Sequence, residues 1–180
     1  MLSPIRLVSE AADFAAHRHT GISRKARANE PYLNHLAEVA NMLAIVTDGS
    51  DAELVAAGWL HDTLEDTRTT RDELEEEFGA RVAALVAEVT DDMSLPKSQR
   101  RQKQIEDAPH KSPDAKLIKI ADKISNILAR IHPNPSSDKR EEELIDYVHW
   151  AEKVVAGCRG GNATLDRMFD DTVKLARSSL

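Results

Sequence analysis

The sequence predicts an all-α protein folded as a compact bundle of about eight or nine helices. Apolar residues recur at helical spacing along nearly the whole chain, and no segment shows the alternating pattern of a β-strand. Aromatic residues make up only 4% of the chain, which is otherwise rich in good helix formers such as Ala, Leu, Glu, Lys and Arg. The chain has 180 residues without an internal repeat or a long linker, so we expect one domain over residues 1–180.

The first predicted helix begins at Ser3-Pro4 and ends near His19. Its predicted inward positions are Leu7, Ala11 and Phe14, which fall on one face. A polar loop over residues 20–30 follows, and Pro31 opens the second helix. The predicted inward face of this second helix consists of Leu33, Leu36, Ala37, Ala40 and Leu43.

Two capping boxes predict the next two helix starts. In residues 50–53, Ser50 and Glu53 can each satisfy a free backbone amide, which predicts a helix from Leu54 to about Leu64. Residues 70–73 repeat the device before a short helix that Gly79 ends. The next helix carries a core stripe at Val82, Leu85, Val86 and Val89.

The second half of the chain predicts three further apolar-faced helices. Pro113 stands at a first helical position. The helix that it opens has a predicted buried face of Leu117, Ile120, Ala121, Ile124, Leu128 and Ile131. A loop is expected over residues 133–137, and the last two helices are expected near residues 138–159 and 162–178.

Composition excludes several classes of function. The formal net charge is −7, which is the wrong sign for a general nucleic-acid-binding protein. No apolar run of about 18 residues and no signal peptide are found, so neither membrane insertion nor secretion is expected. The single cysteine, Cys158, cannot form an internal disulfide, which favours a cytoplasmic protein. Local basic clusters can still form a pocket for an anion, so the net charge does not exclude a small phosphorylated ligand.

A His-Asp pair at the end of an apolar helix is the most informative local feature. His61 and Asp62 follow the apolar residues 55–60, and Glu65 and Asp66 come four residues after each of them. At 3.6 residues per turn, each i,i+4 pair projects from nearly one side of a helix. Neighbouring carboxylates repel one another, and a divalent cation relieves that repulsion. The alternative is that His61 caps a helix while Glu65 and Asp66 are solvated.

Two further polar residues on other predicted helices extend this set. His35 and Asp122 each lie beside a predicted core face, where either alone would more often be an ordinary hydrogen-bonded residue. Together with His61 and Asp62 they make a set of two nitrogen and two oxygen ligands from three helices. Such a set leaves open positions and suits Mn²⁺ or a similar octahedral ion better than structural Zn²⁺.

The order His, His-Asp, Asp resembles the HD metal-dependent phosphohydrolase superfamily. The surrounding motifs resemble the hydrolase domain of the RelA/SpoT family, and in particular the small alarmone hydrolases of the metazoan SpoT homologue type. The motifs that carry this resemblance are Arg24-Lys25, Glu30–His35, Leu60–Thr67, Ala121–Lys123 and Asn126. The similarity continues through Phe78-Gly79, Leu95–Lys97, Ala108–His110, Trp150-Ala151 and Gly157–Gly160.

The resemblance implies a single HD domain that hydrolyses the 3′-pyrophosphate of ppGpp or pppGpp, with one Mn²⁺ per site. It implies that His35, His61, Asp62 and Asp122 are the metal ligands. It also implies that Glu65 and Asp66 form the catalytic acidic pair, which would position a water molecule and accept its proton. The chain is too short for the synthetase and regulatory domains of the longer relatives.

Cations are needed to bind the diphosphates. The resemblance places Arg24 and Lys25 at the mouth of the site. From the basic stretch 97–103 we select Lys97 and Arg101, which lie four residues apart, and we assign Arg100 and Lys103 to a solvated face. Two further candidates for substrate binding are Asn126, one turn after Asp122, and Tyr147. Tyr32 and Trp59 are assigned to packing.

Three alternatives to this interpretation stay open at this point. Another nucleotide phosphohydrolase activity, such as removal of the 2′-phosphate of NADPH, would use the same ligands. A catalytically silent alarmone-binding protein would keep the pocket, although the Glu65-Asp66 pair argues against it. A helical interaction domain would make the metal set a coincidence. Ser125 departs from the family pattern, in which a bulkier residue is common, and a homo-oligomer is neither predicted nor excluded.

Overall fold

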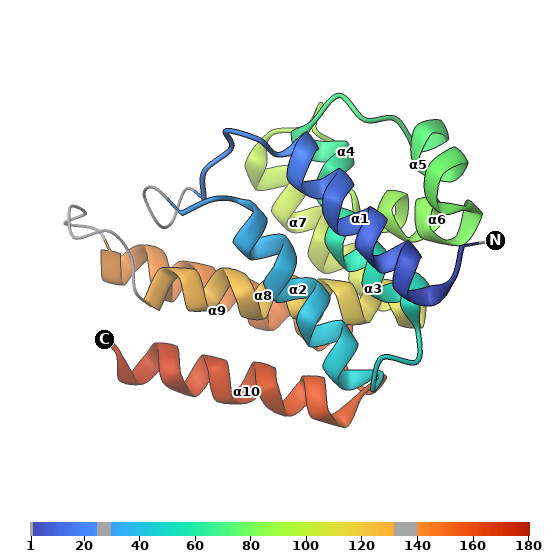
Figure 1. Ribbon diagram of the computed structural model, residues 1–180. Helices are drawn as coiled ribbons and strands as arrows, with labels where there is room; N and C mark the ends of the chain where they lie inside the picture. The colour runs from blue at the N-terminus through green and yellow to red at the C-terminus, as the bar shows by residue number, and fades with distance from the viewer. Residues whose placement is uncertain (1, 25–29, 132–139) are drawn as a thin grey trace.

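The computed structural model describes residues 2–24, 30–131 and 140–180, and their regular structure is helical, with one isolated bridge between Ser23 and Pro31. The helices are α1 (Pro4–Arg18), α2 (Leu33–Val46), α3 (Ala52–Leu60), α4 (Thr63–Asp66), α5 (Arg71–Phe78), α6 (Ala80–Val89), α7 (Lys97–Asp107), the 3₁₀ helix η1 (Ala108–His110), α8 (Pro113–Ile131), α9 (Arg140–Ala156) and α10 (Ala163–Ser178) (Figure 1). The prediction of an all-α bundle is confirmed. Within the described ranges, nine α-helices are longer than one turn, and α4 is a single turn of four residues.

Most helix starts lie where the sequence predicts them. Ser3 accepts a hydrogen bond from the Arg6 amide at the start of α1, and Thr70 accepts one from the Glu73 amide at the start of α5. The predicted cap at Ser50 is wrong by one residue. Asp51 caps α3 instead, because its carboxylate accepts from the Leu54 amide at 3.0 Å, while the Ser50 hydroxyl donates to the Thr47 carbonyl. A negative charge also suits the N-terminus of a helix better than a hydroxyl group does.

The predicted continuous helix from Leu54 to Leu64 is wrong as well. Helix α3 ends at Leu60, His61 is its C-terminal cap, and α4 begins only after Asp62. The amides of Glu65 and Asp66 both donate to the carbonyl of Asp62, so the chain restarts there as a separate turn. The break means that Glu65 is not placed by the i,i+4 geometry that the sequence analysis assumed.

No apolar face was predicted for helix α7 in the sequence analysis. None of its residues is buried, so the sequence shows no core stripe there. The helix lies against α9 and continues into η1. The predicted loop over residues 133–137 lies outside the described part of the chain.

Helix α3 runs through the centre of the bundle and packs against α1, α2, α6 and α8 (Figure 1). Six of its nine residues are buried: Leu54, Val55, Ala56, Ala57, Gly58 and Leu60. Helix α8 is the second central element, since it packs against α2, α9 and α10 in addition. The core therefore holds α2, α3 and α8 close together, and these helices carry the predicted metal ligands.

Gly58 permits the closest approach between two of these helices. A Cβ atom built at Gly58 would lie 2.7 Å from Leu43 Cδ1 and 3.1 Å from the Ala40 Cα atom of α2. A side chain at this position would force Leu43 to shift and the two helices to separate slightly. In the described ranges, no helix is both long and apolar enough to cross a membrane.

Candidate active site

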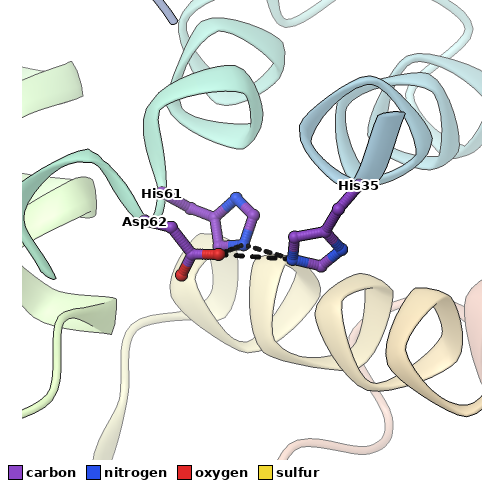
Figure 2. A group of neighbouring side chains, drawn as sticks. All are labelled: His35, His61 and Asp62. Atoms are coloured by element: carbon purple, nitrogen blue, oxygen red, sulfur yellow. Dashed lines mark hydrogen bonds and ion pairs between the residues drawn. The ribbon is translucent and has the colours of Figure 1, made fainter. Parts of the chain in front are cut away.

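The central feature of the site is a cluster of two imidazoles and a carboxylate. His35 comes from α2, whereas His61 and Asp62 come from the junction of α3 and α4, and the three side chains converge (Figure 2). The Nε2 atoms of the two histidines are 3.2 Å apart. Asp62 Oδ2 lies 3.0 Å from His61 Nε2 and 3.3 Å from His35 Nε2. All three ligand atoms lie within 4.8 Å of one another, so these residues could hold a metal ion.

Asp122 approaches the same cluster from α8. Its Oδ1 atom lies 3.4 Å from His35 Nε2 and 4.0 Å from His61 Nε2. The structure thus brings together all four side chains that the sequence analysis selected as ligands. Two imidazole nitrogens and two carboxylates are a donor set that fits a divalent cation.

The protonation state of the cluster follows from its charges. Burial would raise the pKa of Asp62, but His61 and His35 hold that pKa well below its usual range. Burial lowers the pKa of His35, but hydrogen bonds to Asp122 and Asp62 outweigh it and raise the pKa to about 9. These hydrogen bonds favour the protonated form of His35 at neutral pH, which offsets part of the charge of the two carboxylates. A cation that binds here takes over this role and releases the proton.

His61 is held in a fixed orientation by the backbone. Its Nδ1 atom donates to the Gly58 carbonyl at 2.9 Å, which leaves the Nε2 lone pair facing His35 and Asp62 when the ring is neutral. A ligating histidine usually donates its second ring nitrogen in this way. The short turn at the end of α3 therefore prepares His61 to bind an ion.

Glu65 lies at the wall of the cleft next to the cluster. Its Oε1 atom accepts a hydrogen bond from the Asp91 amide at 2.5 Å. Burial, together with the charge of Asp62, raises the pKa of Glu65 to about 7. A carboxyl group with such a pKa can exchange a proton near neutral pH.

Asp66 lies differently from the paired position that the sequence analysis expected. It is exposed, and it is not among the residues that line the cleft. Its charge still acts on the site, since it contributes to the raised pKa of Tyr32. The catalytic role predicted for the Glu65-Asp66 pair stays a prediction.

A cleft of about 230 Å³ that is open to solvent extends from the cluster. Six of the described residues that line it are cations, in a protein with a net charge of −7: Lys97, Arg100, Arg101, Lys119, Lys123 and Arg130. Four acidic residues among those described line the same cleft, so cations outnumber carboxylates there.

Aromatic rings form part of the same wall. Trp150 contacts Tyr147 edge to face, with ring centroids 5.2 Å apart. Arg130 lies 3.7 Å above the Tyr147 ring, and Arg101 lies 4.9 Å above the Trp150 ring. These cation–π contacts place both guanidinium groups against aromatic rings at the wall of the cleft.

Comparison with known proteins identifies the family. The sequence pattern described as the HD domain matches residues 11–153. The chain belongs to the HD domain family. Within this family, the guanosine-3′,5′-bis(diphosphate) 3′-pyrophosphohydrolase MESH1 of Mus musculus is 48% identical over 159 residues, which cover 87% of each chain. The human (Homo sapiens) protein of the same name is also 48% identical, over 92% of each chain.

Two solved structures are similar to this HD domain. One, described as "A metazoan ortholog of SpoT hydrolyzes ppGpp and plays a role in starvation responses", superimposes on the whole chain with a TM-score of 0.88 and 36% identity. The protein lmo0812 of Listeria monocytogenes covers 81% of this chain with a TM-score of 0.65 and 27% identity. The resemblance to hydrolases of the metazoan SpoT homologue type is confirmed.

The predicted substrate-binding residues of this HD domain fall into two groups. Lys97, Arg101, Asn126 and Tyr147 line the cleft. Arg24 does not: it is buried beneath His35 and donates to the carbonyl and the hydroxyl group of Ser125. The expected place of Arg24 at the mouth of the site is therefore corrected, because the guanidinium is drawn inward by the acceptors of α8. Lys25 lies outside the described residues.

Several residues of the HD domain site were missed in the sequence analysis, among them Tyr32, Lys123 and Arg130. Tyr32, which was assigned to packing, donates its hydroxyl proton to Asp62 Oδ2 at 2.5 Å. Lys123 contacts Asp122 Oδ2 at 2.7 Å and lies 4.4 Å above the Trp150 ring. Arg130 lines the cleft beyond Asn126. Its position two turns after Asp122 on one helical face was the available signal, since residues four apart along α8 share that face.

Arg100 also differs from its predicted place on a solvated face. It lines the cleft and donates to the Leu95 carbonyl at 2.8 Å, so the start of α7 turns it toward the site. Lys103, by contrast, lies on the exposed side of α7 as expected and pairs with Asp107. Arg100 therefore faces the cleft, whereas Lys103, three positions later, faces solvent.

Proposed function

We propose that this chain hydrolyses the 3′-pyrophosphate of ppGpp and pppGpp, releasing pyrophosphate and leaving GDP or GTP. Relatives that are 48% identical over nearly the whole chain bear the name of this activity. The observation that carries the proposal is the juxtaposition of the four-residue ligand cluster with a cleft lined by six cations. Hydrolysis of a diphosphate is favoured by a Lewis acid at the reacting phosphoryl group and by a positively charged pocket around the phosphate oxygens.

We propose that His35, His61, Asp62 and Asp122 hold one divalent ion, and that this ion is Mn²⁺. A mixed set of imidazole and carboxylate ligands supports this choice over the thiolate-rich sites typical of structural zinc. When bound, the ion supplies Lewis-acid stabilisation of the negative charge that develops on the phosphoryl oxygens.

The residues of the chain itself then divide the remaining work. Glu65 accepts the proton of the attacking water, for which a pKa of about 7 is well suited. Lys97, Arg101 and Lys123 bind the phosphate oxygens, since their charges face the cleft. Asn126, which donates to Asp122 Oδ1, and Tyr147 line the part of the cleft that would take the ribose or base. We also propose that residues 1–180 form one domain and that the protein is cytoplasmic.

The direct test is turnover of ppGpp by the purified protein, measured as release of pyrophosphate. Activity should appear with Mn²⁺, disappear with a chelator and return when Mn²⁺ is added again. Glu65→Gln should lower kcat by about 10²–10⁴-fold while Mn²⁺ still binds, because only the proton acceptor is removed. Glu10→Gln, on the exposed face of α1, is the matched control and should leave kcat unchanged.

The alternatives give different results in the same assay. Full activity in the presence of chelator would rule out the metal-dependent reaction. Release of phosphate from NADPH with no turnover of ppGpp would assign the site to the other nucleotide. Binding of Mn²⁺ and ppGpp with no turnover of either nucleotide would identify a silent binding protein.

A further inference from the structure

His35 is oriented by side chains, whereas its partner His61 is oriented by the backbone. His35 Nδ1 lies 2.8 Å from the Ser125 hydroxyl oxygen, in a pocket where Ser125 and His35 are both almost fully buried. No carbonyl group of the described residues takes this position, so the ring depends on what surrounds Ser125.

The Ser125 hydroxyl group is held by two further side chains. It donates its single proton to Glu38 Oε2 at 2.5 Å, because an ionised carboxylate can only accept. Arg24 Nη2 donates to the same hydroxyl oxygen and to the Ser125 carbonyl, both at 2.7 Å. Arg24 Nη1 also pairs with Glu38 Oε2 at 3.2 Å, which closes the network.

This arrangement decides which ring nitrogen of His35 carries the proton in the neutral imidazole. The hydroxyl proton of Ser125 is committed to Glu38, so Ser125 can only accept from Nδ1. Arg24 Nη2 also lies 3.4 Å from Nδ1, but its two protons are taken up by the two shorter bonds, both 2.7 Å, to the Ser125 oxygens. Nδ1 must therefore donate, and the lone pair of Nε2 faces His61, Asp62 and Asp122.

We propose that Ser125, Glu38 and Arg24 are positioning residues that fix His35 for binding the divalent ion. The inference rests on the proposed metal-dependent function and adds to it. It also reassigns Arg24, whose guanidinium serves the ligand shell from beneath instead of binding phosphate at the mouth. The small Ser125 side chain leaves room for this network between α2 and α8.

The test is the dissociation constant of Mn²⁺, measured by titration of the metal-free protein without substrate. Ser125→Ala should weaken Mn²⁺ binding by about 10–100-fold, as loss of an outer-shell partner does. At saturating Mn²⁺, kcat should recover to within about threefold and KM for ppGpp should stay unchanged, because neither the cleft wall nor Glu65 is altered. Thr172→Val is the matched control, since it removes one buried hydroxyl group of α10.

A second pair of variants keeps the test valid even if Ser125→Ala fails to fold. Glu38 is about one-third exposed, so changes there disturb the core little. Glu38→Gln retains an oxygen that accepts from Ser125 and should leave the Mn²⁺ affinity within about threefold. Glu38→Ala releases the Ser125 proton toward His35 Nδ1 and should weaken binding by about tenfold.

If the wild-type protein binds Mn²⁺ and either Ser125→Ala or Glu38→Ala binds it with the same affinity, the positioning role is overturned but the proposed function is not. A loss of thermal stability without a change in Mn²⁺ affinity likewise overturns that role, because it shows a purely structural contribution. Failure of the wild-type protein to bind Mn²⁺ would instead overturn the proposed function, and this inference with it.

Discussion

The Tyr32 side chain connects the packing of the bundle with the candidate metal centre. Its ring stacks on His19 at 5.5 Å and meets His35 edge to face at 5.3 Å, while its hydroxyl group donates to Asp62. Burial, together with the charges of Asp62 and Asp66, raises the pKa of the phenol. The hydroxyl group is therefore protonated at neutral pH, where it donates to Asp62.

Removal of this one hydroxyl group should loosen the carboxylate without disturbing the ring. Tyr32→Phe is expected to weaken Mn²⁺ binding by about tenfold, because Asp62 loses the donor that orients it. Isothermal titration of the metal-free protein measures the change. Tyr147→Phe makes the same chemical change on the other wall of the cleft, where the ring contacts Trp150 and Arg130, and should leave the affinity unchanged. Equal affinities of Tyr32→Phe and wild type would contradict this role.

At the scale of elements, the crossing of α2 and α3 sets the distance between the two histidines. Gly58 lies at this crossing, and its carbonyl also holds His61 Nδ1. His35 lies on the same helix as Ala40 and Leu43, the residues that approach Gly58. One small residue thus governs both the approach of the helices and the orientation of a predicted ligand.

Gly58→Ala tests this coupling. The added methyl group gains helix propensity but must displace Leu43, which is fully buried, and press on the Ala40 backbone. We expect a net loss of about 1 kcal/mol in the free energy of unfolding, since overpacking costs about 1–3 kcal/mol and the propensity gain offsets part of it. Mn²⁺ affinity should fall as well, because the helices that carry His35 and His61 move apart.

Urea denaturation and Mn²⁺ titration of the same preparation measure both effects. Gly161→Ala is the control, since its added Cβ atom meets only Leu117 Cδ2 at an ordinary 3.8 Å. A Gly58→Ala protein with wild-type stability and affinity would show that the crossing tolerates the extra methyl group.

At the scale of the whole molecule, charge is distributed unevenly. The chain carries 24 basic and 31 acidic residues, yet the cleft gathers six cations against four acidic residues among the residues that the structure describes. Away from the cleft, Arg81 of α6 joins three elements: it pairs with Asp51 and Glu53 at the start of α3 and with Asp114 of α8. This cluster ties together the starts of the two central helices, away from their ligand-bearing parts.

The Arg81 cluster predicts a dependence of stability on pH. The hydrogen bonds from Arg81 hold the pKa of Asp51 below its usual value, which is about 3.9 in an unfolded chain. A depressed pKa contributes stability that is fully present above the unfolded pKa and is lost as the pH falls through the folded pKa. Asp51→Asn keeps an effective helix cap but loses the charge, so it isolates this contribution.

We therefore expect Asp51→Asn to be less stable than wild type by about 1 kcal/mol at pH 7, with a difference that shrinks as the pH falls below about 4. Urea denaturation across this pH range measures it. Asp171→Asn, which removes an exposed partner of Lys174, should change stability by less than about 0.5 kcal/mol at any pH. A pH-independent difference for Asp51→Asn would show that the effect arises from the cap alone.

The chain alone determined the features that depend on near neighbours. Apolar spacing predicted the helices, and Ser3 and Thr70 marked true helix starts, because a cap and a helical face involve residues only three or four apart. Residues 60–67 and their flanking motifs resemble those of the family, and this resemblance identified the four predicted ligands. In the fold, the carboxylates of Asp62 and Asp122 each lie within 4.0 Å of both histidine Nε2 atoms.

Only the tertiary structure decided how distant side chains share their hydrogen bonds. In the fold, Arg24 lies beneath His35, and the Tyr32 hydroxyl group donates to Asp62. The helix ends at Leu60, so that His61 and Asp62 face α2 and α8. Each of these outcomes depends on a partner that is remote in the chain or on another helix. A buried donor or acceptor must form a hydrogen bond with a group that the packed helices place nearby. Here the packing of α2, α3 and α8, and not the local sequence, determines which group that is.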